Sequence, residues 1–109
     1  MEIKHITKEN FAAEVEQSAL PVLLDLWAPW CVYCRRLAPA LDRVAEKYDG
    51  KLVVGKIDID EQPELGEKLQ ADVIPTLYLY QGGKHGEKVV NPPSQAALEA
   101  WLAQQGVQL

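Results

Sequence analysis

The chain has 109 residues, a hydrophobic fraction of 48% and a formal net charge of −5 at pH 7. This length supports one hydrophobic core and is too short for two, so we expect a single domain over residues 1–109. The acidic balance excludes a surface of clustered Lys and Arg for nucleic acid, and no apolar run reaches the length of about 20 residues that spans a membrane.

The first half of the chain alternates predicted strands and helices. Alternating polar and apolar residues predict a short strand at 3–7, and apolar residues at helical spacing predict a helix at 8–19. Residues 22–27 are apolar at nearly every position, which is typical of a central strand buried on both faces. A longer helical pattern follows at 31–48. Pro39 lies inside this helix and should kink it, because proline has no N–H to donate.

The second half continues with strands at 52–58 and 76–81, a helix at 63–70, a two-glycine turn at 82–83, a return strand at 87–90 and a closing helix around Leu98, Trp101 and Leu102. The order βαβαβαββα predicts an α/β fold with a central mixed five-stranded sheet flanked by four helices. The β-α-β crossovers are expected to place neighbouring strands parallel. The short glycine turn requires the last two strands to be antiparallel.

Both cysteines of the chain lie in the segment Trp30-Cys31-Val32-Tyr33-Cys34, between a predicted buried strand and a predicted helix. If the helix begins at Cys31, the Cα atoms of the two cysteines lie roughly 5 to 5.5 Å apart, within the reach of a disulfide. The free N–H groups and the dipole of a helix N-terminus favour a thiolate there. The segment therefore predicts a redox dithiol in which Cys31 is the nucleophile.

A structural disulfide and a metal site are the alternatives for this pair. A bridge that closes four residues stabilises by only about 2 kcal/mol in the loop-closure estimate, which disfavours a structural staple. A structural zinc site needs four ligands, and beyond the cysteines the chain offers His5, His85 and carboxylates without ligand spacing. No metal site or cofactor is expected within the chain. A cluster shared between two chains needs two thiolates from each and stays open.

Asp25 is the one polar residue of the predicted strand at 22–27. An unpaired carboxylate on a strand buried on both faces is costly, so Asp25 should either stay protonated or find a partner, and we expect its pKa to be raised. A raised pKa suits a proton shuttle. The alternative is a tolerated buried carboxyl group with its own hydrogen bonds.

Taken together, these motifs resemble the thioredoxin family over essentially the whole chain. The matching residues are Asp25, Trp27-Ala28-Pro29-Trp30-Cys31, Cys34, Ala38-Pro39, Lys56, Ile57-Asp58, Ile74-Pro75-Thr76, Gly83 and the closing helix. The resemblance implies the thioredoxin fold and a protein-disulfide oxidoreductase, in which Cys31 attacks a substrate disulfide and Cys34 resolves the mixed disulfide. It further implies that Asp25 serves Cys34 as acid and base, with Lys56 close to it.

The resemblance also implies a substrate-binding surface around the cysteines. Thioredoxins have the peptide that matches Ile74–Pro75 in cis, facing the cysteine pair, where its backbone pairs with an extended substrate segment. Trp30 is expected to be a surface platform at the site. Val32-Tyr33 replaces the usual Gly-Pro and Asn91 replaces a usual Gly in the facing loop, so these positions bear on redox poise and on partner choice.

The expected function is the reduction of protein disulfides, with disulfide-bonded proteins and a thioredoxin-reductase-like electron donor as partners. We expect a monomer. We expect it in the cytoplasm, because the first residues lack the apolar region of a secretion signal. Two alternatives stay open: a more oxidising exchange or isomerase-like protein, and a thioredoxin-fold binding module that holds a partner or a bridging metal cluster. Arg35 and Arg36 follow the cysteines and either add positive charge near the thiolate or form a solvated helix face.

Overall fold

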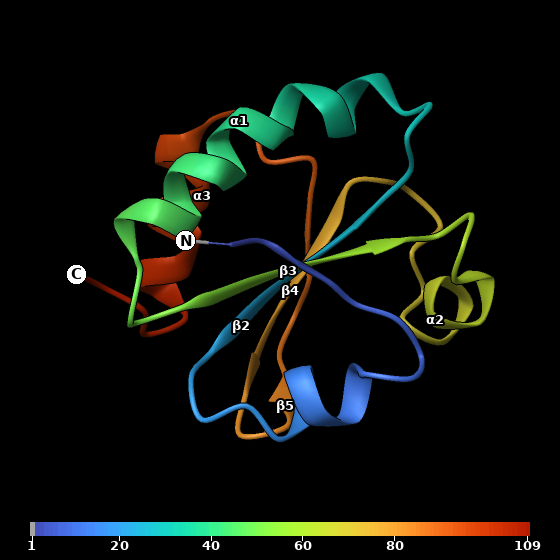
Figure 1. Cartoon of the computed structure of the whole chain (residues 1–109). Coiled ribbons are helices and arrows are strands. Elements are labelled where there is room, and N and C mark those ends of the chain that lie inside the picture. Colours follow the sequence, from blue (N-terminus) through green and yellow to red (C-terminus); the bar gives the residue numbers. More distant parts are fainter. Residues whose placement is uncertain (1) are drawn as a thin grey trace.

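The structure, a computed structural model, describes residues 2–109, and Met1 lies outside the described residues. The elements in chain order are β1 (Lys4–His5), η1 (Ala12–Glu16), β2 (Val22–Trp27), α1 (Val32–Lys47), β3 (Val53–Asp58), α2 (Pro63–Lys68), β4 (Thr76–Gln81), β5 (Lys84–His85), β6 (Val89–Val90) and α3 (Gln95–Gln104). They form one mixed sheet in the order β1-β3-β2-β4-β5, with β6 also paired to β4 (Figure 1). The α/β prediction with a mixed sheet and four helices is confirmed.

The return strand differs from the prediction because it is split in two. β5 follows the glycine turn directly, with His85 opposite Tyr80, and β6 pairs further along β4, with Val90 opposite Thr76. Within the described residues the sheet therefore has six strands where the sequence predicted five. Gly82 and Gly83 both have positive φ, which glycine adopts without steric cost, and they form the turn as predicted.

The direction of β4 corrects the prediction that crossovers place neighbours parallel. β1 and β2 are each parallel to β3, but β4 runs antiparallel to β2, with Thr76 opposite Leu26. The connecting helix α2 has six residues and rises about 9 Å, whereas a strand of that length spans about 20 Å. The chain therefore does not return to the end of the sheet where β2 and β3 begin, and β4 begins where β2 and β3 end.

Two helical layers cover the sheet (Figure 1). On one face, α1 and α3 pack on residues such as Leu23 and Leu77, both fully buried. On the other face, η1 and α2 pack on residues such as Leu24 and Leu26. Because β2 lies between β3 and β4 and is covered on both faces, it is apolar at nearly every position, as the sequence predicted.

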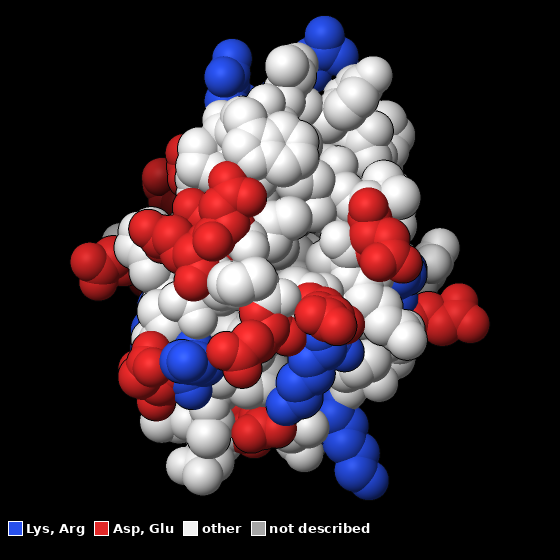
Figure 2. Space-filling view, turned by 90° about the vertical axis from the view of Figure 1, so that its right-hand side faces the viewer, with Lys and Arg blue, Asp and Glu red and all other residues white. Residues whose placement is uncertain are grey.

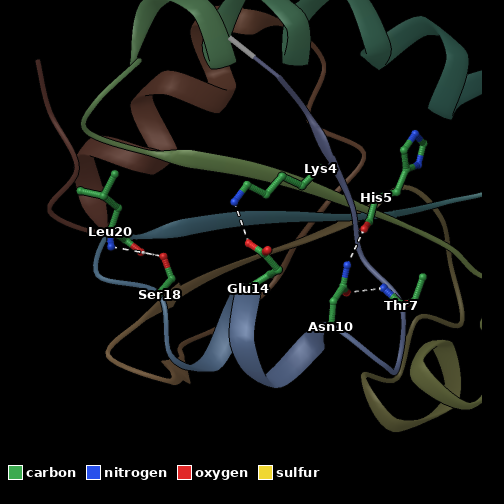
Figure 3. A network of polar contacts seen from close by, with 7 residues as sticks. All are labelled: Lys4, His5, Thr7, Asn10, Glu14, Ser18 and Leu20. Carbon is green, nitrogen blue, oxygen red and sulfur yellow. Dashed lines mark hydrogen bonds and ion pairs between the residues drawn. The ribbon is translucent and has the colours of Figure 1, made fainter.

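The first helix is shorter than the predicted range of 8–19. Figure 3 shows the polar contacts around it: the Asn10 side chain accepts from the N–H of Thr7 at 2.7 Å and donates to the carbonyl of His5 at 2.9 Å. Lys4 pairs with Glu14 at 2.6 Å. The Asn10 contacts hold a turn before the helix, and η1 consists of a single π-type stretch at Ala12–Glu16.

Helix α1 begins one residue later and ends one residue earlier than predicted, because Cys31 and Tyr48 form its caps. Pro39 lies inside it. Helix α2 ends at Lys68 and not at residue 70, where Gln70 has φ +54°. No helix among the described residues has the length and apolar character needed to cross a membrane.

Candidate active site

The cysteine pair lies where β2 passes into α1. The N–H of Cys31 donates to the carbonyl of Ala28 at 3.1 Å, and Cys31 has extended backbone angles, which place it at the N-cap of α1. Its Sγ accepts a hydrogen bond from the N–H of Cys34 at 3.2 Å. The two cysteines form a disulfide with Cα atoms 5.2 Å apart, which confirms the spacing inferred from the sequence.

The two cysteines differ in how deeply they lie. Cys31 is 6% exposed and Cys34 is 1% exposed, and both pack with the buried Ala28. The N–H of Cys34, in the first turn of α1, donates to the Cys31 sulfur. This hydrogen bond becomes stronger when the sulfur is a negatively charged thiolate. The outer sulfur thus has both the access and the donor that a nucleophile needs.

The segment before β4 faces the cysteines. The Ile74–Pro75 peptide is cis, as the resemblance implied. The carbonyl oxygen of Ile74 lies 3.7 Å from Sγ of Cys31. The N–H of Asn91 donates to the carbonyl of Pro75 at 2.9 Å, so this hydrogen bond ties the loop after β6 to the same place. The structure therefore brings together residues that lie 60 positions apart in the sequence.

Asp25 is fully buried, and among residues 2–109 neither of its carboxylate oxygens has a hydrogen-bond partner. Burial raises the pKa of Asp25 to about 7 from an ordinary 3.8, and the positive charge of Lys56 opposes this rise. Lys56 lies opposite Asp25 in the parallel ladder, and its Nζ is 4.5 Å from the centre of the Trp27 ring. The raised pKa predicted from the sequence is confirmed.

Asp25 also lies on the sheet face that carries the cysteine helix. Side chains two apart on a strand share a face, and Leu23 packs in the core under α1 while Trp27 packs beside the cysteines. The carboxyl group therefore lies between that core and the cysteine cluster. At a pKa of about 7 it exchanges a proton readily at neutral pH.

The surface around the disulfide is apolar and exposed. Trp30 is 63% exposed and its Nε1 donates to Oδ2 of Asp60 at 2.8 Å. Val32 and Tyr33 are each about half exposed, and Val73 beside Ile74 is also exposed. Figure 2 shows an uncharged area in the upper part of one face, with acidic groups on either side and basic groups at its upper edge.

A groove of about 280 Å³ opens beside this surface. One wall is the face of α1 formed by Tyr33, Arg36, Leu37 and Ala40, and the other is the loop at 91–94. Tyr33 and Asn91 were both expected at the site from the sequence, but not on opposite walls of one groove. The spacing of the four α1 residues indicates a common helix face, but it does not indicate what faces it.

The described residues contain no group of three or more His, Cys, Asp or Glu side chains placed to hold a metal ion. The two cysteines are bonded to each other, and no other cysteine is present in the chain. The bonded cysteine pair itself offers thiol–disulfide exchange.

A family model described as Thioredoxin matches residues 2–104. The chain belongs to the thioredoxin family. It is 39% identical over 97 residues to Thioredoxin 1 of Nostoc sp., and the match covers 89% of this chain and 91% of the relative. It is 40% identical over 96 residues to the thioredoxin of Streptomyces clavuligerus, and this match covers 88% of this chain and 89% of the relative.

A third relative combines two activities in its name. The chain is 40% identical over 93 residues to the bifunctional thioredoxin reductase/thioredoxin of Mycobacterium leprae, and this match covers 85% of the chain but 20% of the relative. As a thioredoxin-family member with the Cys31–Cys34 disulfide in place, the protein is a thiol–disulfide oxidoreductase.

Proposed function

We propose that the protein reduces disulfide bonds in other proteins through the reversible Cys31–Cys34 dithiol. The observation that carries this proposal is the placement of the pair: Cys31 caps α1, accepts the N–H of Cys34 and is the more accessible sulfur. Cys34 lies one turn further along the helix and deeper. Attack needs the outer sulfur and resolution needs the inner one.

The reaction has two exchanges. In the first, the Cys31 thiolate attacks one sulfur of the substrate disulfide, so that a mixed disulfide forms and the other substrate sulfur leaves as a thiolate that takes up a proton. In the second, Cys34 loses its proton and attacks Sγ of Cys31, which releases the second substrate thiol. The substrate gains two electrons and two protons, and the protein ends as the disulfide seen in the structure.

Asp25 is the proposed acceptor of the Cys34 proton. It lies on the sheet face under the helix that carries Cys34, and burial brings its pKa to about 7. A base of this pKa is half deprotonated at neutral pH, which suits both directions of proton transfer. Lys56 lowers the pKa of Asp25, so it keeps a fraction of the carboxyl group ionised.

The proposed substrate surface consists of Trp30, Val32, Tyr33, Ile74, Pro75 and Asn91. Main-chain hydrogen bonds to the backbone at Ile74 would hold an extended substrate strand and favour no particular side chain. The exposed apolar side chains at positions 30, 32 and 33 supply contact area on either side of the attacked disulfide.

A thioredoxin-reductase-like protein is the proposed electron donor, since the Mycobacterium leprae relative is named for both activities in one chain. We also propose that the protein acts as a monomer in the cytoplasm. These proposals rest on the comparison and on the sequence. Mixing the purified protein with a reductase tests the donor, measuring its mass in solution tests the monomer, and fractionating the source cells tests the location.

The decisive experiment is insulin reduction with dithiothreitol as electron source. The wild-type protein should accelerate precipitation of the insulin B chain, and Cys31→Ser should abolish the acceleration. Cys34→Ser should instead accumulate a mixed disulfide with insulin through Cys31, visible by non-reducing electrophoresis. Equal activity of wild type and Cys31→Ser would refute the proposal. Equilibration with glutathione then separates a reductant from the more oxidising alternative.

A further inference from the structure

The groove between α1 and the loop at 91–94 has a charge of one sign. Of its lining residues, Arg36 alone is charged, and no carboxylate lines the groove. Within the described part of the chain, the salt bridges involve Lys4, Lys8 and Lys47, and none involves Arg36. The guanidinium lies 5.5 Å from the centre of the Tyr33 ring, so the ring supports it at the rim of the groove.

The groove adjoins the reacting disulfide. Tyr33 lies between the two cysteines in the sequence, and Asn91 on the other wall donates to the carbonyl of Pro75, next to the residue whose carbonyl faces Cys31. A polypeptide held along Ile74 with one of its cysteines over Cys31 therefore places neighbouring side chains at the mouth of the groove.

The surface next to Trp30 is acidic. Oδ2 of Asp60 accepts a hydrogen bond from Nε1 of Trp30, and the N–H of Asp60 donates to Oδ1 of Asp58. Figure 2 shows acidic groups on both sides of the uncharged area and basic groups at its upper edge. A substrate segment thus meets carboxylates near Trp30 and a guanidinium near Tyr33.

We propose that the Tyr33–Arg36 groove is a specificity subsite that binds a carboxylate side chain of the substrate polypeptide, next to the disulfide that Cys31 attacks. This inference rests on the proposed function and adds a preference for substrate segments with an Asp or Glu beside the reacting cysteine. Arg36 binds the carboxylate and Tyr33 holds the guanidinium in place. Leu37 and Ala40, on the same α1 wall, are the apolar contacts for the methylene groups.

The test compares disulfide-linked homodimers of two peptides that share an alanine-based sequence with one cysteine. One peptide carries glutamates on both sides of the cysteine, and the other carries lysines. Reduced protein is mixed with excess peptide in a stopped-flow instrument, and tryptophan fluorescence reports the exchange. Because the same thiolate attacks both peptides, the ratio of the two rate constants cancels any change in thiol reactivity.

Arg36→Gln should lower the glutamate-to-lysine rate ratio by about threefold to fivefold, the change expected from an exposed ion pair of up to about 1 kcal/mol. Arg35→Gln is the matched control, since it removes the same charge from the neighbouring exposed position but does not line the groove. Its ratio should stay close to that of the wild type. At about 1 M ionic strength, where the Debye length is about 3 Å, the effect of Arg36→Gln should shrink.

Equal changes of the glutamate-to-lysine rate ratio in Arg36→Gln and Arg35→Gln would overturn the subsite. The preference would then come from the overall electrostatic field of the protein and not from the groove. An unchanged ratio in Arg36→Gln would overturn it as well. Cys31→Ser separates the two proposals. If Cys31→Ser reacts with the peptides as the wild type does, the proposed function fails. If Cys31→Ser is inactive but Arg36→Gln leaves the glutamate-to-lysine rate ratio unchanged, the subsite alone fails.

Discussion

Replacing Asp25 by Asn should make the protein more stable at neutral pH but not at acidic pH. The substitution keeps the shape of the side chain and removes its titration. Asp25 is fully buried without a hydrogen-bond partner among the described residues, and its pKa rises from 3.8 to about 7 on folding. The folded state therefore binds this proton more tightly than the unfolded state does.

The sign of the pH dependence follows from this difference. Between about pH 4 and 7 the unfolded chain has lost the proton while the folded protein keeps it, so the free energy of unfolding falls as the pH rises. The difference of about three pKa units corresponds to about 4 kcal/mol, at about 1.4 kcal/mol per unit. Above about pH 8 the full penalty is present, and below about pH 4 it is absent.

Urea unfolding of the oxidised proteins, followed by tryptophan fluorescence, measures this effect. The stability of Asp25→Asn relative to the wild type should increase by about 3 kcal/mol between pH 5 and 8. Lys56→Gln is a useful second variant, because Lys56 lowers the pKa of Asp25 and its removal should move the midpoint of the pH dependence upward. A constant difference between Asp25→Asn and wild type across this range would refute the reasoning.

Three other predictions concern reactivity, packing and backbone strain. Iodoacetamide at about pH 7 should alkylate Cys31 of the reduced protein before Cys34, because Cys31 is the more exposed cysteine and caps the helix. Peptide mapping gives the order of alkylation, and the reverse order would contradict the assigned roles. Gly55→Ala should cost about 1 to 3 kcal/mol in urea unfolding, because its Cβ would lie 2.8 Å from Cγ1 of Ile6, and an unchanged midpoint would show that Ile6 moves freely. Asn91 has φ +45°, so Asn91→Ala should unfold at a lower temperature than Asn91→Gly, by about 1 kcal/mol of stability, and equal melting temperatures would remove the strain argument.

The sequence predicted the central strands well and the edges less well. β2 and β4 have the bounds that their apolar runs indicated, because both are buried on two faces and every position contributes to the pattern. The return strand and the first helix are at the periphery, where local hydrogen bonds such as those of Asn10 decide the ends. The direction of β4 depends on the short span of α2, which periodicity does not report.

The site shows the same division. The spacing of Cys31 and Cys34 and the burial of Asp25 follow from local sequence and simple energetics. The cis peptide at Ile74–Pro75 and the position of Lys56 beside Asp25 were available only through the resemblance to thioredoxins. The groove was missed, because it exists only where the loop at 91–94 folds against α1, and no local pattern records that contact.

Pro39 has a consequence for how the protein changes its oxidation state. Proline donates no hydrogen bond, so the carbonyl of Arg35 lacks the helical partner that residue 39 would otherwise supply. The N–H of Arg35 still closes the first turn on the carbonyl of Cys31. The turn that carries the cysteines is therefore joined to the rest of α1 by one hydrogen bond fewer. Small displacements of this turn, when the sulfurs separate or join, need not reach Leu41 and Val44, which anchor the helix on the sheet.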